Sequence, residues 1–413
     1  MLMAALLLAS CTKYEPEQPM KDAAYIRVFN SITTNVEPTD GGILPFLTFM
    51  MDPAGDAKNG LTGAEVMCDY LNTRQLSSQS YPTDADTDPS APSTIGSGPS
   101  GQPLYTGIVN FEYPGKYHVP AAPAMNGFDM SSWAQVKPGK HRIVFVVRPK
   151  NNTPFAQLDQ PVRQTTLIDT TIELKAGEVY TLEAVQISRD APVAYALYAR
   201  QENFFKKAFD GDKIYVGFDN ISGNYPKAAQ AGFLRYFSDT VNIYYSYLMR
   251  DVISSVNATL PILGMNNLLY STISTKRSGE ISNYLALPML PRSYFFYKDS
   301  TIKTFPTHLD TDNTTAANNG VQKDEDLPFV RFDFYNYNGA TGKILSLNCS
   351  ANPVTLPFYD PNIQYVRRYL PNLNLIINNN NKIHIYPTVS ILEICYDRVY
   401  MLQMQRAFNE VPR

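Results

Sequence analysis

The sequence has little tryptophan, histidine, cysteine and charge. Of its 413 residues, one is Trp, four are His and four are Cys. Lys plus Arg number 35 and Asp plus Glu number 38, a net charge of −3, which excludes a strongly basic nucleic-acid-binding protein. Charged residues make up 18%, against about 25% in ordinary domains. The length suits about two or three domains, each with a core of its own.

Catalytic and metal-binding motifs are also missing. The chain has no G-x-S-x-G elbow, no HExxH pair, no Walker A motif and no Cys-x-x-Cys pair. The histidines, His118, His141, His308 and His384, have no partner that the sequence identifies. We therefore expect no enzyme, no cofactor and no metal site. A glycosidase with carboxylates paired across a β fold stays open, because sequence does not show such pairs.

Two acidic segments, 84–88 and 310–312, have oxygen-bearing side chains at alternate positions, as calcium loops do. The first has Pro89 where a calcium loop has its turn glycine and Ile95 where it has a bidentate Glu. The second has Val321 at the latter position. Both segments are interpreted as solvated acidic loops.

Aromatic residues are abundant, at 28 Tyr and 21 Phe, and both favour strands. Short segments of alternating pattern, separated by turn residues, predict antiparallel β-sandwiches and an all-β fold. These segments are 24–30, 141–147, 167–174, 178–185 and 195–198, then 214–221, 241–245, 329–337, 382–386, 391–396 and 399–404. Residues 63–75 are predicted to hold a short helix.

The strand pattern begins again near residue 205. Segment 214–221 can be laid on segment 25–32, which places Phe218 on Phe29 and Asp219 on Asn30. We therefore predict two tandem domains, one over residues 23–205 and one over residues 206–413. Two polar inserts, about 82–103 and 309–326, are predicted to be mobile loops.

The first residues are apolar and lead to a cysteine. Residues 2–9 are too few to span a bilayer as a helix and fit the apolar region of a signal peptide. They end in Leu8-Ala9-Ser10-Cys11, which resembles the lipobox of bacterial lipoproteins. The resemblance implies that residues 1–10 are removed, that Cys11 carries lipid, and that residues 11–22 form a tether. No Lys or Arg precedes Cys11.

Glu15 and Glu17 resemble the surface-export signal of lipoproteins in Bacteroides-type bacteria, although a solvated linker explains them equally well. The expected location is the outer membrane, at the cell surface or the periplasmic face. Cys68, Cys349 and Cys395 remain after processing. Either Cys349 pairs with Cys395 in this oxidising compartment, or these cysteines are buried as small apolar side chains.

Three blocks of the first half resemble domain of unknown function 4397. They are Arg-Val-Phe-Asn-Ser at 27–31, Pro-Gly at 138–139 and the segment 174–182. This family occurs in exported bacterial proteins, often in tandem on lipoproteins of Bacteroides-type bacteria. The resemblance implies immunoglobulin-like or transthyretin-like sandwiches, and it assigns no site residues because the family has no established molecular function. The second half matches weakly, with Arg292 in place of the turn glycine.

Two surface features remain. Segments 244–247, 294–297 and 332–337 are dense in aromatic residues, of which alternate members face opposite ways. The outward set either covers a sheet or forms a platform for sugar rings or a protein. Thr170, Thr240 and Ser300 each follow an Asp and resemble O-glycosylation acceptors of Bacteroides-type exported proteins.

These observations predict a non-catalytic, lipid-anchored envelope protein that binds or adheres to a glycan or protein partner, with the membrane contacted through Cys11. The alternative is an accessory subunit of a surface fibre or envelope complex, in which a donated strand completes a sheet. A nucleic-acid partner is not expected.

Overall fold

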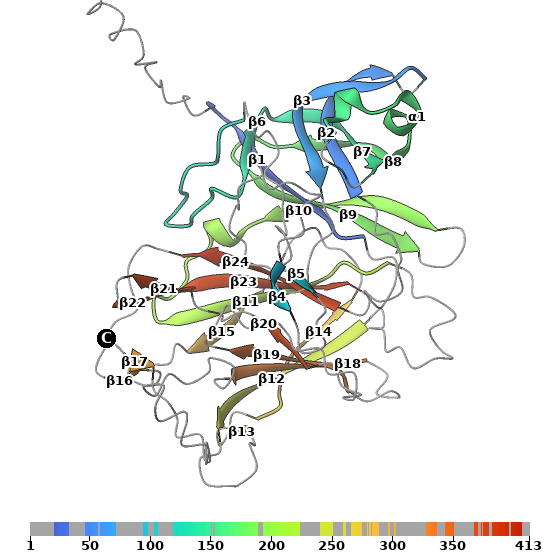
Figure 1. Ribbon diagram of the computed structural model, residues 1–413. Coiled ribbons are helices and arrows are strands. Elements are labelled where there is room, and N and C mark those ends of the chain that lie inside the picture. Colours follow the sequence, from blue (N-terminus) through green and yellow to red (C-terminus); the bar gives the residue numbers. More distant parts are fainter. Residues whose placement is uncertain are drawn as a thin grey trace, which may run out of the picture.

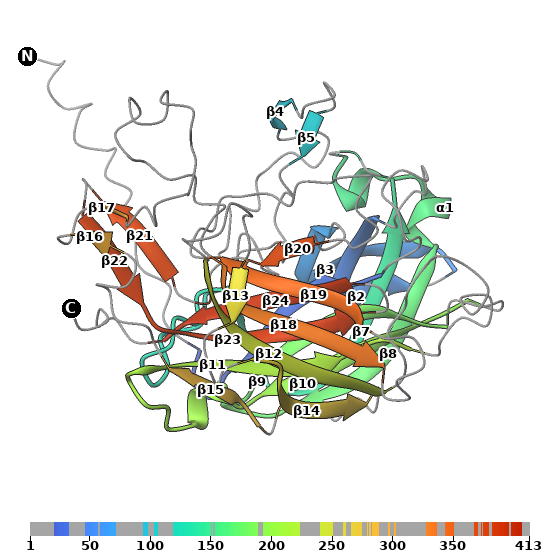
Figure 2. The same cartoon turned by 90° about the horizontal axis from the view of Figure 1, so that it is seen from below.

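The computed structural model describes residues 20–32, 46–56, 58–71, 94–97, 103–105, 119–149, 151, 153–188, 193–223, 240–250, 259–261, 266–274, 279, 281, 283–288, 296–297, 301–302, 328–336, 343–350, 367–370, 373, 375–379, 382–395 and 398–406. Most of these residues lie in strands, and the few helices are short. Figure 1 shows the main strands as four sheets stacked one above another, here numbered 1 to 4 from the top of that view. Figure 2 looks at the same stack from below.

Sheets 1 and 2 form the first sandwich. Sheet 1 has the strand order β3-β2-β7-β8, and sheet 2 has the order β10-β9-β1-β6. The strands of sheet 1 are β2 (Phe46–Asp56), β3 (Gly60–Leu71), β7 (Gly139–Arg148) and β8 (Thr166–Leu174). Those of sheet 2 are β1 (Ala24–Asn30), β6 (Ala134–Val136), β9 (Val179–Ser188) and β10 (Ala194–Glu202). Short helices η1 (Phe155–Gln157) and α1 (Gln160–Arg163) cover the outer face of sheet 1.

Sheets 3 and 4 form the second sandwich. Sheet 3 has the order β15-β11-β23-β24, and sheet 4 has the order β13-β12-β18-β19-β20, with β14 also paired to β12. The strands of sheet 3 are β11 (Lys213–Asn220), β15 (Leu285–Pro288), β23 (Thr388–Cys395) and β24 (Arg398–Gln405). Those of sheet 4 are β12 (Thr240–Arg250), β13 (Thr259–Pro261), β14 (Leu268–Ser274), β18 (Pro328–Asn336), β19 (Lys343–Ser350) and β20 (Arg367–Leu370).

The remaining elements are short. Three two-stranded hairpins pair β4 (Thr94–Ser97) with β5 (Pro103–Tyr105), β16 (Phe296–Tyr297) with β17 (Thr301–Ile302), and β21 (Leu375–Asn379) with β22 (Lys382–Tyr386). Helix η2 (Phe204–Lys206) lies between the two sandwiches in the chain. No helix in the described ranges has the length and apolar character needed to cross a membrane.

Each neighbouring pair of sheets encloses an apolar core. The cores include Val28 and Phe145 between sheets 1 and 2, Phe29 and Ile391 between sheets 2 and 3, and Phe218 and Phe332 between sheets 3 and 4. The two inner sheets are therefore buried on both faces, since alternate residues of a strand point to opposite sides. The prediction of an all-β protein with two sandwiches is confirmed.

The two sandwiches share one strand plan. In the first, β1 pairs in parallel with β9 and antiparallel with β6. In the second, β11 pairs in parallel with β23 and antiparallel with β15. The ladders correspond residue by residue, because Tyr25 lies opposite Val179 and Tyr215 lies opposite Val389. Each sandwich thus contains a parallel strand pair within its otherwise mainly antiparallel sheets.

The predicted alignment of the two halves is wrong by one residue. It placed Asp219 on Asn30, but the ladder places Asn220 there. Both asparagines accept a hydrogen bond from the backbone N–H two residues on, at 3.3 and 3.2 Å, which forms an Asx turn. The alignment by residue type had matched Phe29 with Phe218, whose side chains point into different cores.

The predicted helix at 63–75 is also wrong for residues 63–71, which belong to β3. Val66 and Cys68 pack inside the first sandwich, whereas Met67 packs on the opposite face of sheet 1. Burial that alternates with a period of two is the pattern of a strand. Residues 72–75 lie outside the described residues, as do most of the two predicted inserts.

Candidate functional site

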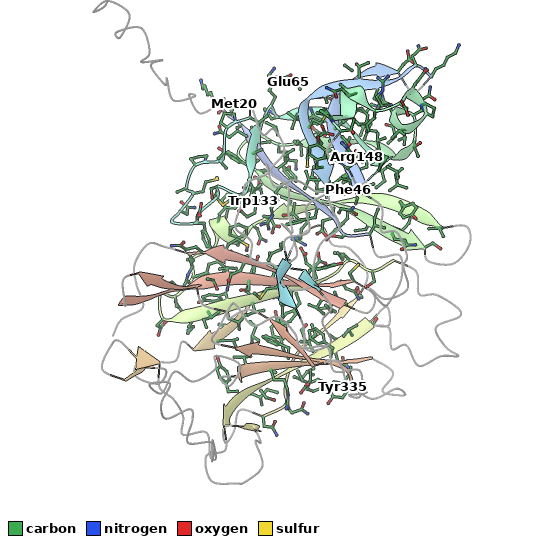
Figure 3. All side chains as sticks on the ribbon, viewed as in Figure 1. Met20, Phe46, Glu65, Trp133, Arg148 and Tyr335 are labelled. Carbon is green, nitrogen blue, oxygen red and sulfur yellow. The ribbon has the colours of Figure 1, made fainter. Side chains whose placement is uncertain are left out.

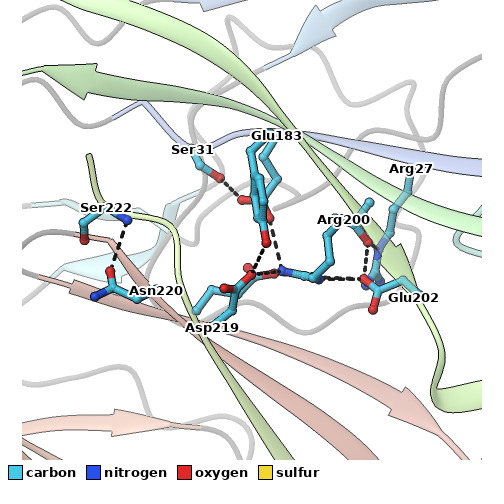
Figure 4. A network of polar contacts seen from close by, with 11 residues as sticks. Arg27, Ser31, Glu183, Arg200, Glu202, Asp219, Asn220 and Ser222 are labelled. Atoms are coloured by element: carbon cyan, nitrogen blue, oxygen red, sulfur yellow. Dashed lines mark hydrogen bonds and ion pairs between the residues drawn. The ribbon is translucent and has the colours of Figure 1, made fainter. Parts of the chain in front are cut away.

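Sheets 2 and 3 face each other across a layer that contains buried charges (Figure 4). On β1, β9 and β10, alternate side chains point away from the first sandwich core and toward sheet 3. We call the following residues the charged layer: Arg27, Glu183, Arg200 and Glu202 from sheet 2, and Asp219 and Glu393 from sheet 3. All of them are buried.

Arg200 lies at the centre of the charged layer. Its guanidinium is 3.0 Å from Glu202 and 3.5 Å from Glu183, both on sheet 2. From sheet 3 it contacts Asp219 at 3.0 Å, and it also contacts Glu393. One cation therefore joins the two sandwiches.

Arg27 is held by a second set of contacts. Its Nε donates to Thr181 Oγ1 at 3.0 Å, and the Thr181 hydroxyl donates to Glu202 Oε1 at 2.5 Å. The guanidinium carbon lies 3.8 Å from the ring centroid of Trp133, which makes a cation–π contact. The one tryptophan of the chain is itself buried and so helps to stabilise a buried cation.

Hydroxyl groups complete the charged layer. Tyr198 donates to Asp219 Oδ2 at 2.9 Å, and Ser31 donates to Glu183 Oε2 at 2.7 Å. Burial alone would lower the pKa of Arg200, but its surrounding carboxylates raise that pKa well above the ordinary value. Burial raises the pKa of Asp219, and Arg200 offsets only part of this rise. A proton on Asp219 would reduce the excess of carboxylates over arginines.

The charged layer brings carboxylates together, as a glycosidase requires, but it does so between two packed sheets. A sugar could reach these groups only if the sandwiches separated. Within the described part of the chain, no group of three or more His, Cys, Asp or Glu side chains could hold a metal ion. The arrangement of Arg200 and its partners is suited to joining the sandwiches.

The outward face of sheet 4 offers a different chemistry. The rings of Tyr244 and Tyr335 meet edge to face, with centroids 5.3 Å apart. Leu269 lies opposite Tyr244 in the ladder and is 57% exposed. Beside them, Thr272 Oγ1 donates to Asn242 Oδ1 at 2.6 Å. We call these residues the outer tyrosine face.

The aromatic segments of the sequence divide as their alternation predicted. Tyr247, Phe332 and Phe334 are buried in the core between sheets 3 and 4, whereas Tyr244 and Tyr335 are only partly buried. Burial, with Asp333 as a second cause, raises the pKa of Tyr335. Residues 294, 295 and 337 lie outside the described residues.

The structure places few of the other candidate residues in a site. His141 is buried, with its ring nitrogens 2.7 Å from Asp52 Oδ2 and 2.8 Å from Lys137 O. Thr170 lies on β8, beside the Asp169–Arg142 ion pair. Thr240 begins β12.

Several predicted residues lie outside what the structure describes. They are Cys11, Ser300, His118, His308, both calcium-like segments, Glu15 and Glu17. His384 and Cys349 fall in β22 and β19, but their side chains are not described. Cys395 is buried, with its thiol 3.7 Å from the Ser31 carbonyl oxygen. Its pairing with Cys349 stays a prediction, because the side chain of Cys349 is not described.

The charged layer was missed by sequence reasoning. Its signal was present, because a Glu interrupts an apolar strand at the same position of each half: Glu183 in β9 and Glu393 in β23. Arg27 and Arg200 carry no such signal, since their partners come from distant strands.

Comparison with known proteins gives little. No protein-family model matches the chain, and no curated protein matches it. Among solved structures, a putative cell adhesion protein from Parabacteroides distasonis is 10% identical, and the match covers 93% of this chain and all of that one. Its TM-score is 0.15, so this likeness carries no argument.

Proposed function

We propose that the chain is a non-catalytic, lipid-anchored envelope protein that presents its outer tyrosine face to a glycan or protein partner. The observation that carries the proposal is the layout of the stack. Met20 lies at the top of Figure 3, where its N–H donates to Gln135 of the first sandwich at 2.8 Å. Tyr335 lies at the bottom, on sheet 4. An anchor that precedes Met20 would therefore hold the first sandwich near the membrane.

The tether sets the distance of the stack from the anchor. Cys11 and Met20 are separated by residues 12–19, which span at most about 30 Å when extended. The first sandwich would then sit close to the lipid headgroups, and sheet 4 would face away from them. Such an arrangement suits recognition of a partner outside the membrane.

The outer tyrosine face has the groups that sugar recognition uses. Aromatic rings pack on the apolar faces of sugars, and the Asn242 amide and Thr272 hydroxyl supply hydrogen bonds to sugar hydroxyls. Exposed Leu269 widens the apolar area. A peptide segment with apolar side chains would use the same groups, so the class of partner is left to experiment.

Anchoring is tested by protease treatment of intact cells that express the wild type or Cys11→Ala. We expect the wild type to be cut on whole cells and the variant to leave the membrane fraction. Retention of Cys11→Ala in membranes would contradict anchoring, and protection of the wild type until the envelope is broken would contradict surface exposure.

Recognition is tested by binding to a broad glycan array and to host-matrix proteins. Tyr335→Ala should reduce any binding at least tenfold, while Lys140→Ala, an exposed change on sheet 1, should leave it unchanged. Equal loss in both variants, or binding by neither variant nor the wild type, would reject the outer tyrosine face as the site.

The fibre-subunit alternative rests on strand pairing at a sheet edge. It is favoured by one specific observation, the outer edge of β10, where no backbone group in the described ranges bonds to Tyr195, Leu197 or Ala199. That edge leads to a separate proposal.

A further inference from the structure

We infer that the outer edge of β10 pairs with the same edge of a second copy of this chain, in an antiparallel arrangement centred on Leu197. β10 is the edge strand of sheet 2, with β9 on its inner side. The inference rests on the direction of its backbone groups, on its side chains and on the orientation that self-pairing gives the two copies.

The ladder shows which amides of β10 point outward. The carbonyls of Glu178 and Ala184 point toward β1, because they accept hydrogen bonds from Tyr25 N and Ser31 N. Successive residues of a strand direct their backbone groups to opposite sides. The backbone groups of Glu183, next to Ala184, therefore bond to β10. Those of its ladder partner Tyr198 bond to β9 in return.

Tyr195, Leu197 and Ala199 consequently direct their N–H and C=O groups away from β9. Gln201, two residues beyond Ala199, confirms that this alternate set points outward, because its N–H donates to the Gly279 carbonyl at 2.8 Å. Within the described ranges, no backbone group bonds to the outward amides of Tyr195, Leu197 and Ala199. A β-bulge at Ala194 and Tyr195 marks the other end of this regular edge.

The side chains lack the features that usually protect an edge. Segment 193–199 reads Val-Ala-Tyr-Ala-Leu-Tyr-Ala, without charge or proline, whereas exposed edges are commonly blocked by Lys or Pro. Tyr195, Leu197 and Ala199 are only partly buried against the first core. An open, uncharged edge of this kind is a template for another strand.

Self-pairing fits this segment in shape. With a two-fold axis at Leu197, Tyr195 of one copy lies opposite Ala199 of the other, and Ala196 lies opposite Tyr198. Each large ring thus meets a small residue across the pair, and no like charges face each other. A foreign strand would gain the backbone bonds without this complementarity.

The orientation of the copies is also consistent. The two-fold axis of an antiparallel pair runs perpendicular to the sheet, and here it follows the stacking direction of the four sheets (Figure 1). Both copies would therefore carry Met20 at the same end. Two anchors could enter one membrane, although the pairing itself does not require lipid.

Disulfide trapping tests the axis. In the full chain, Leu197→Cys places two thiols opposite each other, with Cα atoms about 5.5 Å apart, inside the range a disulfide needs. A mild oxidant should convert most of the protein to a disulfide-linked dimer. Ala199→Cys is the matched control on the same edge. Its two copies would lie about 13 Å apart along the strands, so we expect at least five-fold less dimer.

Two further arms keep the result decisive. The parent chain, with its own cysteines, sets the background, and Cys11→Ala carrying Leu197→Cys separates self-pairing from anchoring. Leu197→Pro removes an outward N–H without removing a bond to β9 and should give a monomer by light scattering. No dimer from folded Leu197→Cys, equal dimer from Ala199→Cys, or linkage to a partner of another mass would each overturn the inference.

Discussion

The two sandwiches use equivalent positions differently at the layer between them. In the first, Arg27, Thr181 and Arg200 form one row across sheet 2. In the second, the equivalent row across sheet 3 runs from Gly217 through Ile391 to Leu402. A polar row with two cations thus corresponds to a row without charge.

In the next row, sheet 3 has more charged residues than sheet 2. Glu183 lies between Phe29 and Tyr198 in the first sandwich, whereas Glu393 lies between Asp219 and Tyr400 in the second. Sheet 3 therefore contributes two carboxylates to the charged layer, and the nearest cation, Arg200, comes from sheet 2. The second sandwich depends on the first for charge compensation, while the first supplies both signs itself.

Arg200→Leu should have the largest effect, because it removes the cation that compensates both sheets. It also gives the first sandwich the residue that the second has at the equivalent position, Leu402. The carboxylates around Arg200 would lose their shared cation while remaining buried. We expect the free energy of unfolding of the full chain to fall by about 3–5 kcal/mol, measured by urea denaturation. Arg142→Leu, which removes a half-exposed ion pair with Asp169, should cost no more than about 1 kcal/mol. Similar losses in the two variants would refute the comparison.

Gly217→Ala tests why the second sandwich lacks an arginine at the position of Arg27. A Cβ atom at Gly217 would lie 2.9 Å from Ile281 Cγ2 and 2.9 Å from Tyr284 Cε1. Such crowding should lower the free energy of unfolding by about 1–3 kcal/mol. Gly211→Ala has open space around its new methyl group and should change stability by less than about 0.5 kcal/mol. An unchanged midpoint in Gly217→Ala would show that the site can relax.

The Asx turns at Asn30 and Asn220 are a feature that the two sandwiches share, so equivalent substitutions can be compared there. Asn220→Ala removes the hydrogen bond to Ser222 N and should cost about 1 kcal/mol. Asn30→Ala removes the equivalent bond and also the contact of Asn30 Nδ2 with Leu71 O at 3.4 Å. Its loss should be the larger of the two in thermal or urea unfolding. The reverse order would mean that the turns are not equivalent.

Asp219→Asn should give the smallest effect, which appears as a change in pH dependence. The folded-state pKa of Asp219 is above its ordinary value of 3.8 because of burial. The stabilising contribution of its bound proton is therefore full below pH 3.8 and is lost as pH rises through the folded-state pKa. Above pH 4 we expect wild-type stability to fall relative to Asp219→Asn. A constant difference between the two across this range would argue against a raised pKa.

The sequence predicted the strands better than the contacts between them. Alternation and turn residues located β1, β7, β8 and β11 to within about two residues, since those signals are local. The repeat was found but misaligned, because Phe29 and Phe218 are alike in type and differ in the core they fill.

The charged layer could not be predicted in the same way. Arg27 and Glu202 are separated by most of the first half of the chain, and Arg200 and Glu393 by most of the second. Only the packing of sheet 2 on sheet 3 makes these residues neighbours. The outer tyrosine face was predictable as an alternative, because alternation alone gives the outward set.

The parallel pairing of β1 with β9, and of β11 with β23, has a consequence for the order in which the chain folds. Tyr25 must wait for Val179 to be synthesised, and Tyr215 must wait for Val389. Contacts so distant in sequence form slowly, and the waiting strand exposes apolar surface meanwhile. During synthesis, Val216 can pair with Leu285 of β15 on one side, but its partner on the other side, Ser390 of β23, emerges from the ribosome about a hundred residues later. A helper that shields unpaired strands should therefore matter for both sandwiches, at β1 until β9 is made and at β11 until β23 is made.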